Sequence, residues 1–254
     1  MSRITRQQLQ QWCHRELSVS QFKDYAPNGL QVEGKADIGQ LVTGVTACEA
    51  LIDAAIDAGA DGILVHHGYF WKGEAPELTG MKGRRIRKLM QHELNLFAYH
   101  LPLDAHGEWG NNRALADRMN WRVAGPLIAG QHPAIGNIAD LEQPIEALAL
   151  ELQLTEQLSH PVQWIAGGPT HIRRIGWCTG AAQDYLEHAV AQGCDAFVSG
   201  EISERTVHEA REMGIHYFAA GHHATEKGGV QRLGQAIAAE FGIQVEFIDI
   251  PNPV

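Results

Sequence analysis

The amino-acid sequence predicts an α/β protein made of two similar α/β domains. Two observations indicate this fold class. Strand-like and helix-like segments alternate along the chain, which is the pattern of a sheet with helical crossovers. In addition, the second half of the chain resembles the first, which indicates an internal repeat.

Each expected element of the first half follows from its local pattern. Apolar, strand-like runs occupy residues 40–47, 62–67 and 94–100, and helical patterns occupy residues 48–59, 83–93 and 111–120. Before them, the first 17 residues predict an amphipathic helix with Thr5 as its N-cap and Gln8 as the capping-box partner. This segment lacks the apolar core of a signal peptide, and no apolar run reaches the roughly 18 residues expected of a membrane span.

The second half repeats this order of elements. The strand-like segment RRIGWCTG at 173–180 resembles residues 40–47, and Gly59 and Asp61 correspond to Gly193 and Asp195 at an offset of 134 residues. We therefore expect a first α/β unit at 1–125, a connecting segment at 126–165 with one helix near 142–152, and a second α/β unit at 166–254.

The composition excludes several classes of protein. The chain has 254 residues, 44% hydrophobic and 20% charged, as in an ordinary globular protein. Its net charge of −10 argues against sequence-independent nucleic-acid binding, which requires many Lys and Arg contacts to phosphate. The four cysteines have no CxxC spacing, so we expect free thiols in a reducing cytoplasm, and we expect no membrane partner.

Histidines and carboxylates follow the expected strands. Ligands bind at the carboxyl ends of strands in α/β sheets. Four expected strand ends have such side chains: His66-His67, His100 with Asp104, Glu201, and His222-His223 with Glu226. Imidazole and carboxylate donors without a nearby cysteine suit a divalent ion such as Zn, Mn, Fe, Ni or Co. For any one of these histidines, a hydrogen-bonded structural role is the alternative.

The number of these side chains indicates two ions. Two histidines and one aspartate from the first half, with one histidine and one glutamate from the second, give five ligands, enough for two metals that share a bridging carboxylate. Such a metal centre would lie between the two similar domains. His222 and Glu226 share one face if their turn is helical, whereas their spacing says little if the turn is a loop.

The same segments resemble a known family. DYAPNGLQVEG (24–34), VHHGYFWKG (65–73), YHLPLDAH (99–106), SGEISERTVHEARE (199–212) and GHHATEKGG (221–229) are similar to the Nif-three-like dinuclear-metal family, in its short bacterial form. Its members are called GTP cyclohydrolase I type 2 homologues. The resemblance implies two divalent ions per subunit, held by His66, His67, Asp104, His222 and Glu226, with His223 as a neighbour. It also implies a toroidal homohexamer of chains with two similar α/β domains, whose metal centres face an inner cavity.

The resemblance implies a metal-dependent hydrolase. The cyclohydrolase name refers to opening of the imidazole ring of GTP by metal-activated water, so we expect a small-molecule substrate that is a nucleotide or a related heterocycle. The candidates for proton transfer are Glu201, His208, His100 and His223. We favour Glu201 and His208 as acid/base residues, and orientation of the ligands or satisfaction of buried polar groups is their alternative role. The competing hypothesis is a non-catalytic hexameric scaffold or regulatory protein that binds metals.

Four other segments invite interpretation. The aromatic residues 69–71 could stack on a planar base or pack the loop, and the basic run 82–88 could attract an anionic nucleotide or form a solvated helix face. Asn111 and Asn112 begin an expected helix and suit helix caps. Residues 24–32 (DYAPNGLQV) contain a turn motif and are expected to be a fold element or an oligomer contact.

Overall fold

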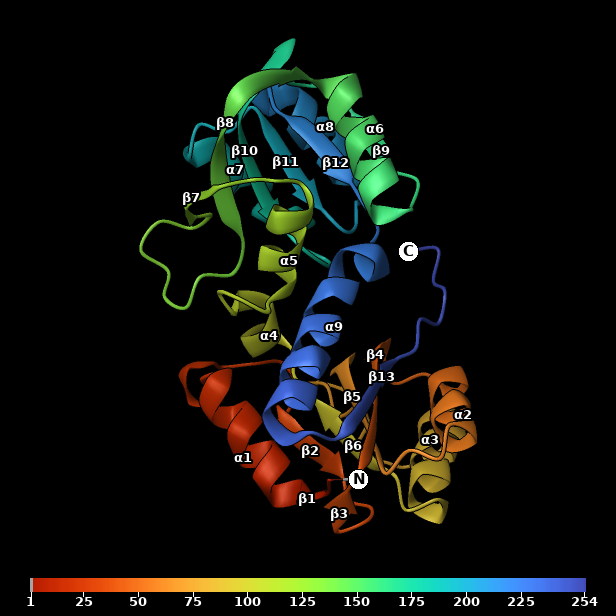
Figure 1. Ribbon diagram of the computed structural model, residues 1–254. Coiled ribbons are helices and arrows are strands. Elements are labelled where there is room, and N and C mark those ends of the chain that lie inside the picture. Colours follow the sequence, from red (N-terminus) through yellow and green to blue (C-terminus); the bar gives the residue numbers. More distant parts are fainter. Residues whose placement is uncertain (1) are drawn as a thin grey trace. The chain divides into compact units, whose positions relative to one another are not determined.

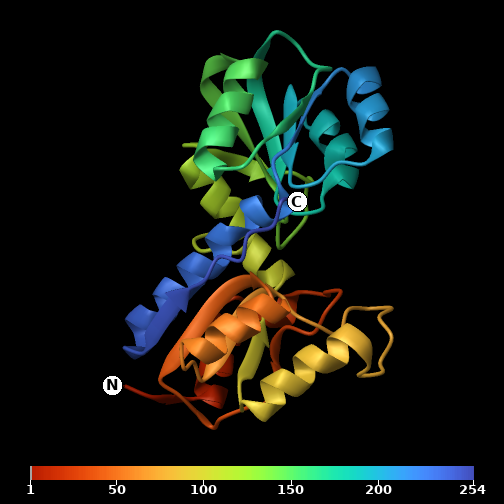
Figure 2. The same ribbon diagram turned by 90° about the vertical axis from the view of Figure 1, so that its right-hand side faces the viewer.

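The computed structural model describes residues 2–254, which form two compact units. The first contains residues 2–103 and 229–251, and the second contains residues 104–228 and 252–254. Each unit has its own sheet with helices on both faces (Figures 1 and 2), which confirms the α/β class. No helix in the described part of the chain is both long and apolar enough to cross a membrane.

The first unit is built on a five-stranded sheet. Its strand order is β13-β4-β5-β6-β2, and β2 alone runs antiparallel to its neighbour. The strands are β2 (Gly29–Val32), β4 (Gln40–Thr46), β5 (Gly62–His67), β6 (Asn95–Ala98) and β13 (Gln244–Phe247). Two short strands, β1 (Ile4–Thr5) and β3 (Asp37–Ile38), form a separate antiparallel pair. Because β5 is buried between two parallel neighbours, its residues 62–66 are all buried.

Helices pack on both faces of this sheet. α2 (Glu49–Asp57) and α3 (Gly80–Gln91) cover one face, where Leu51 and Leu89 join a core with Ile63 and Leu96. α1 (Arg6–Glu16), followed by the short helix η1 (Val19–Gln21), covers the other face together with the later turns of α9 (His222–Phe241). The predicted capping box of α1 is confirmed, since Thr5 and Gln8 exchange side-chain and backbone hydrogen bonds.

The second unit contains a six-stranded sheet. Its order is β7-β8-β10-β11-β12-β9, with β10, β11 and β12 parallel. The strands are β7 (Val123–Pro126), β8 (Asn137–Glu146), β9 (Gln163–Ile165), β10 (His171–Cys178), β11 (Ala196–Ser199) and β12 (His216–Ala219). The helices are α4 (Leu101–Ala105), α5 (Asn111–Arg118), α6 (Ala147–Leu158), η2 (Gln183–Tyr185), α7 (Leu186–Ala191) and α8 (Glu204–Met213). One apolar core includes α5 and α6, and another includes α7 and α8.

Two aspartates occupy equivalent places in the two sheets. Asp61 Oδ2 accepts hydrogen bonds from the backbone N–H groups of Gly39 and Gln40, at 2.8 and 3.2 Å. Asp195 Oδ2 accepts from the N–H groups of residues 173 and 174 at 2.7 and 3.0 Å. All three positions are shifted by the offset of 134 residues. The same local contact therefore ties the second strand of each repeat to the start of the first.

Charges around Asp61 stabilise its ionised form. Burial by itself would raise the pKa of this carboxyl, but the hydrogen bond from Lys35 and those from the Gly39 and Gln40 backbone lower it overall. Arg3 adds a salt bridge to Asp61 at 3.1 Å.

The compact units divide the chain differently from the ranges 1–125, 126–165 and 166–254. The last strand, β13, pairs with β4, so residues 229–251 belong to the first unit. The segment expected to be a connection supplies β8, α6 and β9 to the second sheet, because β8 pairs with β10 and β9 with β12. Sequence similarity marked the repeated core but not the strands added at its edges.

Candidate metal centre

In the first unit, β5 delivers two histidines to its carboxyl end. His66 is fully buried and His67, the last residue of the strand, is partly exposed. Gly68 follows the strand, and a Cβ atom there would lie 2.2 Å from Oε1 of Gln31 and 2.7 Å from Cβ of Ala98. The strand ends directly after the histidine pair, and only glycine leaves room for these close neighbours at the next position.

Oxygen atoms orient both imidazole rings. Nδ1 of His66 lies 2.9 Å from the carbonyl oxygen of Tyr99, which can only accept, so Nδ1 carries a proton and donates this hydrogen bond. Nδ1 of His67 lies 3.1 Å from Oγ1 of Thr46. One ring nitrogen from each of His66, His67 and His100 lies within 4.8 Å of the other two. The first unit thus gathers three imidazoles at one strand end.

In the second unit, the first turn of α9 pairs His222 with Glu226. His222 Nε2 lies 3.0 Å from Glu226 Oε2, so the turn is helical and the two side chains share a face, as their spacing indicates. On the other side of the ring, His222 Nδ1 lies 2.6 Å from Oε1 of Glu201, which follows β11. Burial would lower the pKa of His222, but Glu226 and then Glu201 raise it to about 9.

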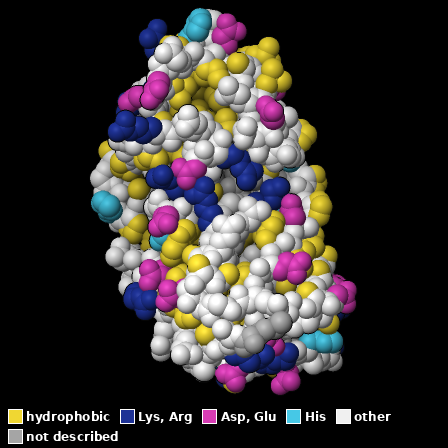
Figure 3. All heavy atoms as spheres, in the orientation of Figure 1, with side chains coloured by type: hydrophobic (Ala, Val, Ile, Leu, Met, Phe, Trp, Pro, Cys, Tyr) yellow, Lys and Arg dark blue, Asp and Glu magenta, His cyan; other side chains and the backbone are white. Residues whose placement is uncertain are grey.

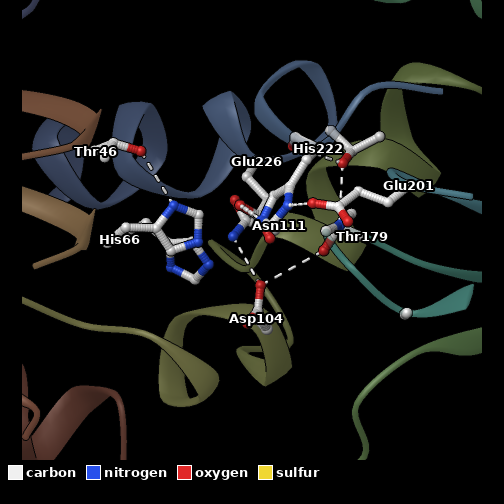
Figure 4. Close-up of polar contacts among 12 residues, drawn as sticks. Thr46, His66, Asp104, Asn111, Thr179, Glu201, His222 and Glu226 are labelled. Carbon is white, nitrogen blue, oxygen red and sulfur yellow. Dashed lines mark hydrogen bonds and ion pairs between the residues drawn. The ribbon is translucent and has the colours of Figure 1, made fainter. Parts of the chain in front are cut away.

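Asp104 lies on α4 and is held by neighbouring side chains. Asn111 Nδ2 donates to Asp104 Oδ1 at 2.8 Å, and Thr179 Oγ1 lies 3.5 Å from the same oxygen (Figure 4). Asn112 Nδ2 donates to the Asp104 carbonyl at 3.2 Å. The prediction that the two asparagines cap their helix is wrong, because Gly110 is the N-cap and has no side chain to form the cap. Their amides instead fix the position of Asp104.

A glycine makes room for Glu226. Gly180 follows β10 in the left-handed conformation, with φ +72°, and a Cβ atom there would lie 2.2 Å from Glu226 Oε1. A carboxylate oxygen of Glu226 lies within 4.8 Å of one of Asp104. The two charges, after burial itself, raise the pKa of the buried thiol of Cys178 well above its ordinary value. The second unit thus brings together all three of its expected ligands.

The two candidate acid/base residues lie in different surroundings. Glu201 contacts His222, as described above, and so orients an expected ligand. His208 lies on α8, where Nε2 is 3.2 Å from Glu204 Oε1 and the side chain is 64% exposed. His223 is buried, and its backbone N–H donates to the carbonyl oxygen of Val254.

In the aromatic and basic segments of the first unit, one aromatic ring lies next to His67, whereas other residues pack the fold or form salt bridges at the surface. Tyr69 is buried and donates a hydrogen bond from its hydroxyl to the carbonyl of Ala47, so it packs the fold. The ring of Trp71 lies next to His67, with centroids 6.0 Å apart. In the basic run, Lys88 forms salt bridges with Glu49 and Asp53, which makes that part a paired surface. Acidic and basic side chains are interspersed on the face of the molecule in Figure 3.

The donor atoms fit divalent ions. Imidazole nitrogens and carboxylate oxygens bind several first-row metals, and metal-ligating histidines usually donate their second ring N–H to an oxygen. His66, His67 and His222 each have an oxygen partner at Nδ1. Sequence reasoning did not predict that Asn111, Thr179 and Gly180 support this set, and it indicated Asn111 only as a helix cap.

The fold and this set of side chains define a class of protein: a two-repeat α/β protein with histidine and carboxylate clusters at its strand ends. The chain belongs to the Duf34/NIF3 (NGG1p interacting factor 3) family, whose model matches residues 4–253. The family resemblance found in the sequence is thereby confirmed.

Curated relatives and solved structures match over the whole chain. The protein named GTP cyclohydrolase 1 type 2 homolog of Vibrio cholerae serotype O1 is 51% identical, with 97% of this chain and 98% of the relative covered. The protein of the same name from Haemophilus influenzae is 49% identical with the same coverage. A solved structure described as protein ybgI, of unknown function, superposes with a TM-score of 0.95 at 44% identity and covers 99% of this chain and 100% of its own.

Proposed function

We propose that the chain binds two divalent metal ions through His66, His67, Asp104, His222 and Glu226. The observation that most supports this ligand set is the oxygen partner at Nδ1 of each of its three histidines. In this arrangement Nε2 of each ring is the binding nitrogen, and its direction is fixed before the ion arrives. The contact of His222 with Glu226 and the hydrogen bond from Asn111 to Asp104 also hold these side chains in place before an ion binds.

We further propose that the protein is a hydrolase that acts on a nucleotide or a related heterocycle. Divalent ions bound at such a centre would lower the pKa of coordinated water and polarise the substrate. The names of the relatives support a cyclohydrolase type of reaction. The open set of nitrogen and oxygen donors also differs from the closed, cysteine-rich cages of structural zinc.

The surrounding residues then have distinct roles. Glu201 accepts a hydrogen bond from the Nδ1–H of His222 and keeps the ring turned toward Glu226. Asn111 holds one oxygen of Asp104 and so fixes the orientation of the carboxylate. His208 has no part in this proposal, because its exposed side chain is paired with Glu204.

Family resemblance and composition extend the proposal to the protein's setting. We expect a homo-oligomer, a toroidal hexamer by resemblance, located in the cytoplasm. All four cysteines are free thiols, as a reducing compartment requires. The alternative is a hexameric scaffold that binds metals without catalysis.

Metal analysis followed by a substrate-panel assay tests the proposal. Wild type, His67→Ala and Glu226→Ala would be compared with His171→Ala, a control at an exposed histidine. In wild type and control, we expect two metal ions per chain and turnover of one nucleotide or heterocycle. In the two ligand variants, we expect loss of bound metal and loss of turnover. Stoichiometric metal without turnover across nucleotides, pterins and phosphoesters would favour the scaffold. Equal metal content and activity in all four proteins would overturn both parts of the proposal.

A further inference from the structure

The segment at 24–28, expected to be part of a fold element or an oligomer contact, holds His100 beside the histidine pair on β5. Asp24 Oδ1 lies 2.7 Å from His100 Nδ1, and Asp24 Oδ2 accepts from Asn28 Nδ2 at 2.8 Å and from the Leu101 N–H at 2.9 Å. Asn28 Oδ1 accepts from the backbone N–H of His100 at 2.8 Å. Ring and backbone of His100 are therefore both fixed by one short segment.

The Asp24 carboxylate is built to remain ionised although it is buried. Its side chain is only 4% exposed. Burial would raise the pKa of Asp24, but the hydrogen bonds that its carboxylate accepts from His100 and Asn28 lower it overall. An ionised carboxylate can only accept, so the proton between the two groups belongs to His100 Nδ1. In the neutral ring, Nε2 is then a hydrogen-bond acceptor.

The ring of His100 lies next to two of the expected ligands. Its ring centroid is 5.1 Å from that of His66 and 5.9 Å from that of His67. Trp71 stands almost perpendicular to it, at 85° and 5.0 Å, and so limits rotation of the ring. The His100 side chain is 18% exposed, so a small ligand or water at the strand end can reach it.

We propose that His100 is a positioning residue: its Nε2 accepts a hydrogen bond from an O–H or N–H group of the water or substrate bound beside His66 and His67, and Asp24 and Asn28 fix it for this role. The inference depends on the metal-binding function proposed above. Five other side chains already supply ligands for two ions, so His100 is assigned to the bound molecule and not to the metal. An acceptor at Nε2 of His100 would also favour substrates that can donate a hydrogen bond from an N–H or O–H group, as a purine ring or a ribose can.

Metal binding by variants separates a positioning role from a ligand role. Wild type, His100→Ala, Asp24→Asn, His67→Ala and the exposed control His92→Ala would be titrated with Zn²⁺ and compared by elemental analysis, with circular dichroism to confirm folding. We expect His100→Ala and Asp24→Asn to retain the wild-type stoichiometry and an affinity within about twofold. A loss of about 10–100-fold in Asp24→Asn, the usual effect of removing the partner of a metal ligand, would overturn the proposal. So would loss of metal from His100→Ala to the extent seen in His67→Ala.

Neutron diffraction of the zinc-loaded wild-type protein tests the hydrogen bond itself and needs no variant. We expect deuterium on Nδ1 of His100 facing Asp24, none on Nε2, and a deuterium of the bound water or ligand directed at Nε2. Deuterium on Nε2, or a zinc ion within about 2.0–2.1 Å of it, would refute the assignment. If wild type bound no zinc at all, the proposed metal function would fail, whereas the position of the deuterium between His100 and Asp24 would still be measured in the metal-free crystal.

Discussion

The glycine beside Glu226 gives a sharp test of the second unit's part of the metal centre. Gly180→Ala places a methyl group 2.2 Å from Oε1 of Glu226, whereas real Cβ contacts shorter than 3.0 Å are essentially never seen. Because Gly180 follows β10 and Glu226 lies in a helix, the carboxylate must swing away by roughly an ångström. A displacement of this size removes a ligand atom from the position set by His222.

A second glycine of the same unit provides the matched control. Gly193 has φ +69°, close to the +72° of Gly180, but a Cβ there would meet nothing within 4 Å. Both alanine variants should therefore lose about 1–2 kcal/mol of stability from the left-handed backbone alone. Only Gly180→Ala should lose metal affinity, by at least the 10–100-fold that disturbing the partner of a ligand typically costs.

Two assays separate these effects. Urea denaturation of the metal-free proteins compares the free energies of unfolding, and titration with Zn²⁺ against a chromophoric chelator compares the affinities. Equal zinc affinity in Gly180→Ala and Gly193→Ala would refute the placement of Glu226 in the centre. A difference in affinity with similar unfolding free energies would support it.

Buried polar contacts in the two units give three more expected outcomes. Asn111→Leu removes the donor to Asp104, so zinc affinity should fall about 10–100-fold and unfolding free energy by about 1–3 kcal/mol; unchanged values in calorimetry and urea denaturation would contradict this. The lowered pKa of Asp61 stabilises the fold above the ordinary carboxyl pKa of about 3.9, and this stability is lost as pH falls through the lower folded value. Urea midpoints measured from pH 6 to pH 2 should therefore fall more steeply for wild type than for Asp61→Asn, and parallel curves would disprove the assignment. Tyr69→Phe loses the hydrogen bond to Ala47 and should cost about 1 kcal/mol without changing zinc affinity, whereas weaker zinc binding would give the ring a role at the site.

Periodic and repeated features of the fold were predictable from the sequence. The strand at 62–67 and the helix that follows Thr5 have strong local patterns, and the structure places them within a residue of the expected bounds. Gly59 and Asp61 repeat as Gly193 and Asp195, and each aspartate accepts hydrogen bonds from the equivalent backbone N–H groups. The pairing of β13 with β4 could not be predicted, since no local pattern shows which distant strand an edge strand will join.

The candidate site also has a part that was predictable from the sequence and a part that was not. Histidines at strand ends are visible in the sequence because unusual residues follow an apolar run. The residues that orient them are not, because Asp24 and Asn111 act through single contacts to His100 and Asp104, across 76 and 7 residues. His208 differs from these residues, since its side chain lies on an exposed helix face and is paired with Glu204.

Anomalous diffraction from crystals of the metal-loaded protein tests the central claim most directly. The account predicts two peaks per chain, with His66, His67, Asp104, His222 and Glu226 as their ligands and Glu226 shared between them. Peaks bound by other side chains, or a metal-soaked crystal with none at these five residues, would contradict it.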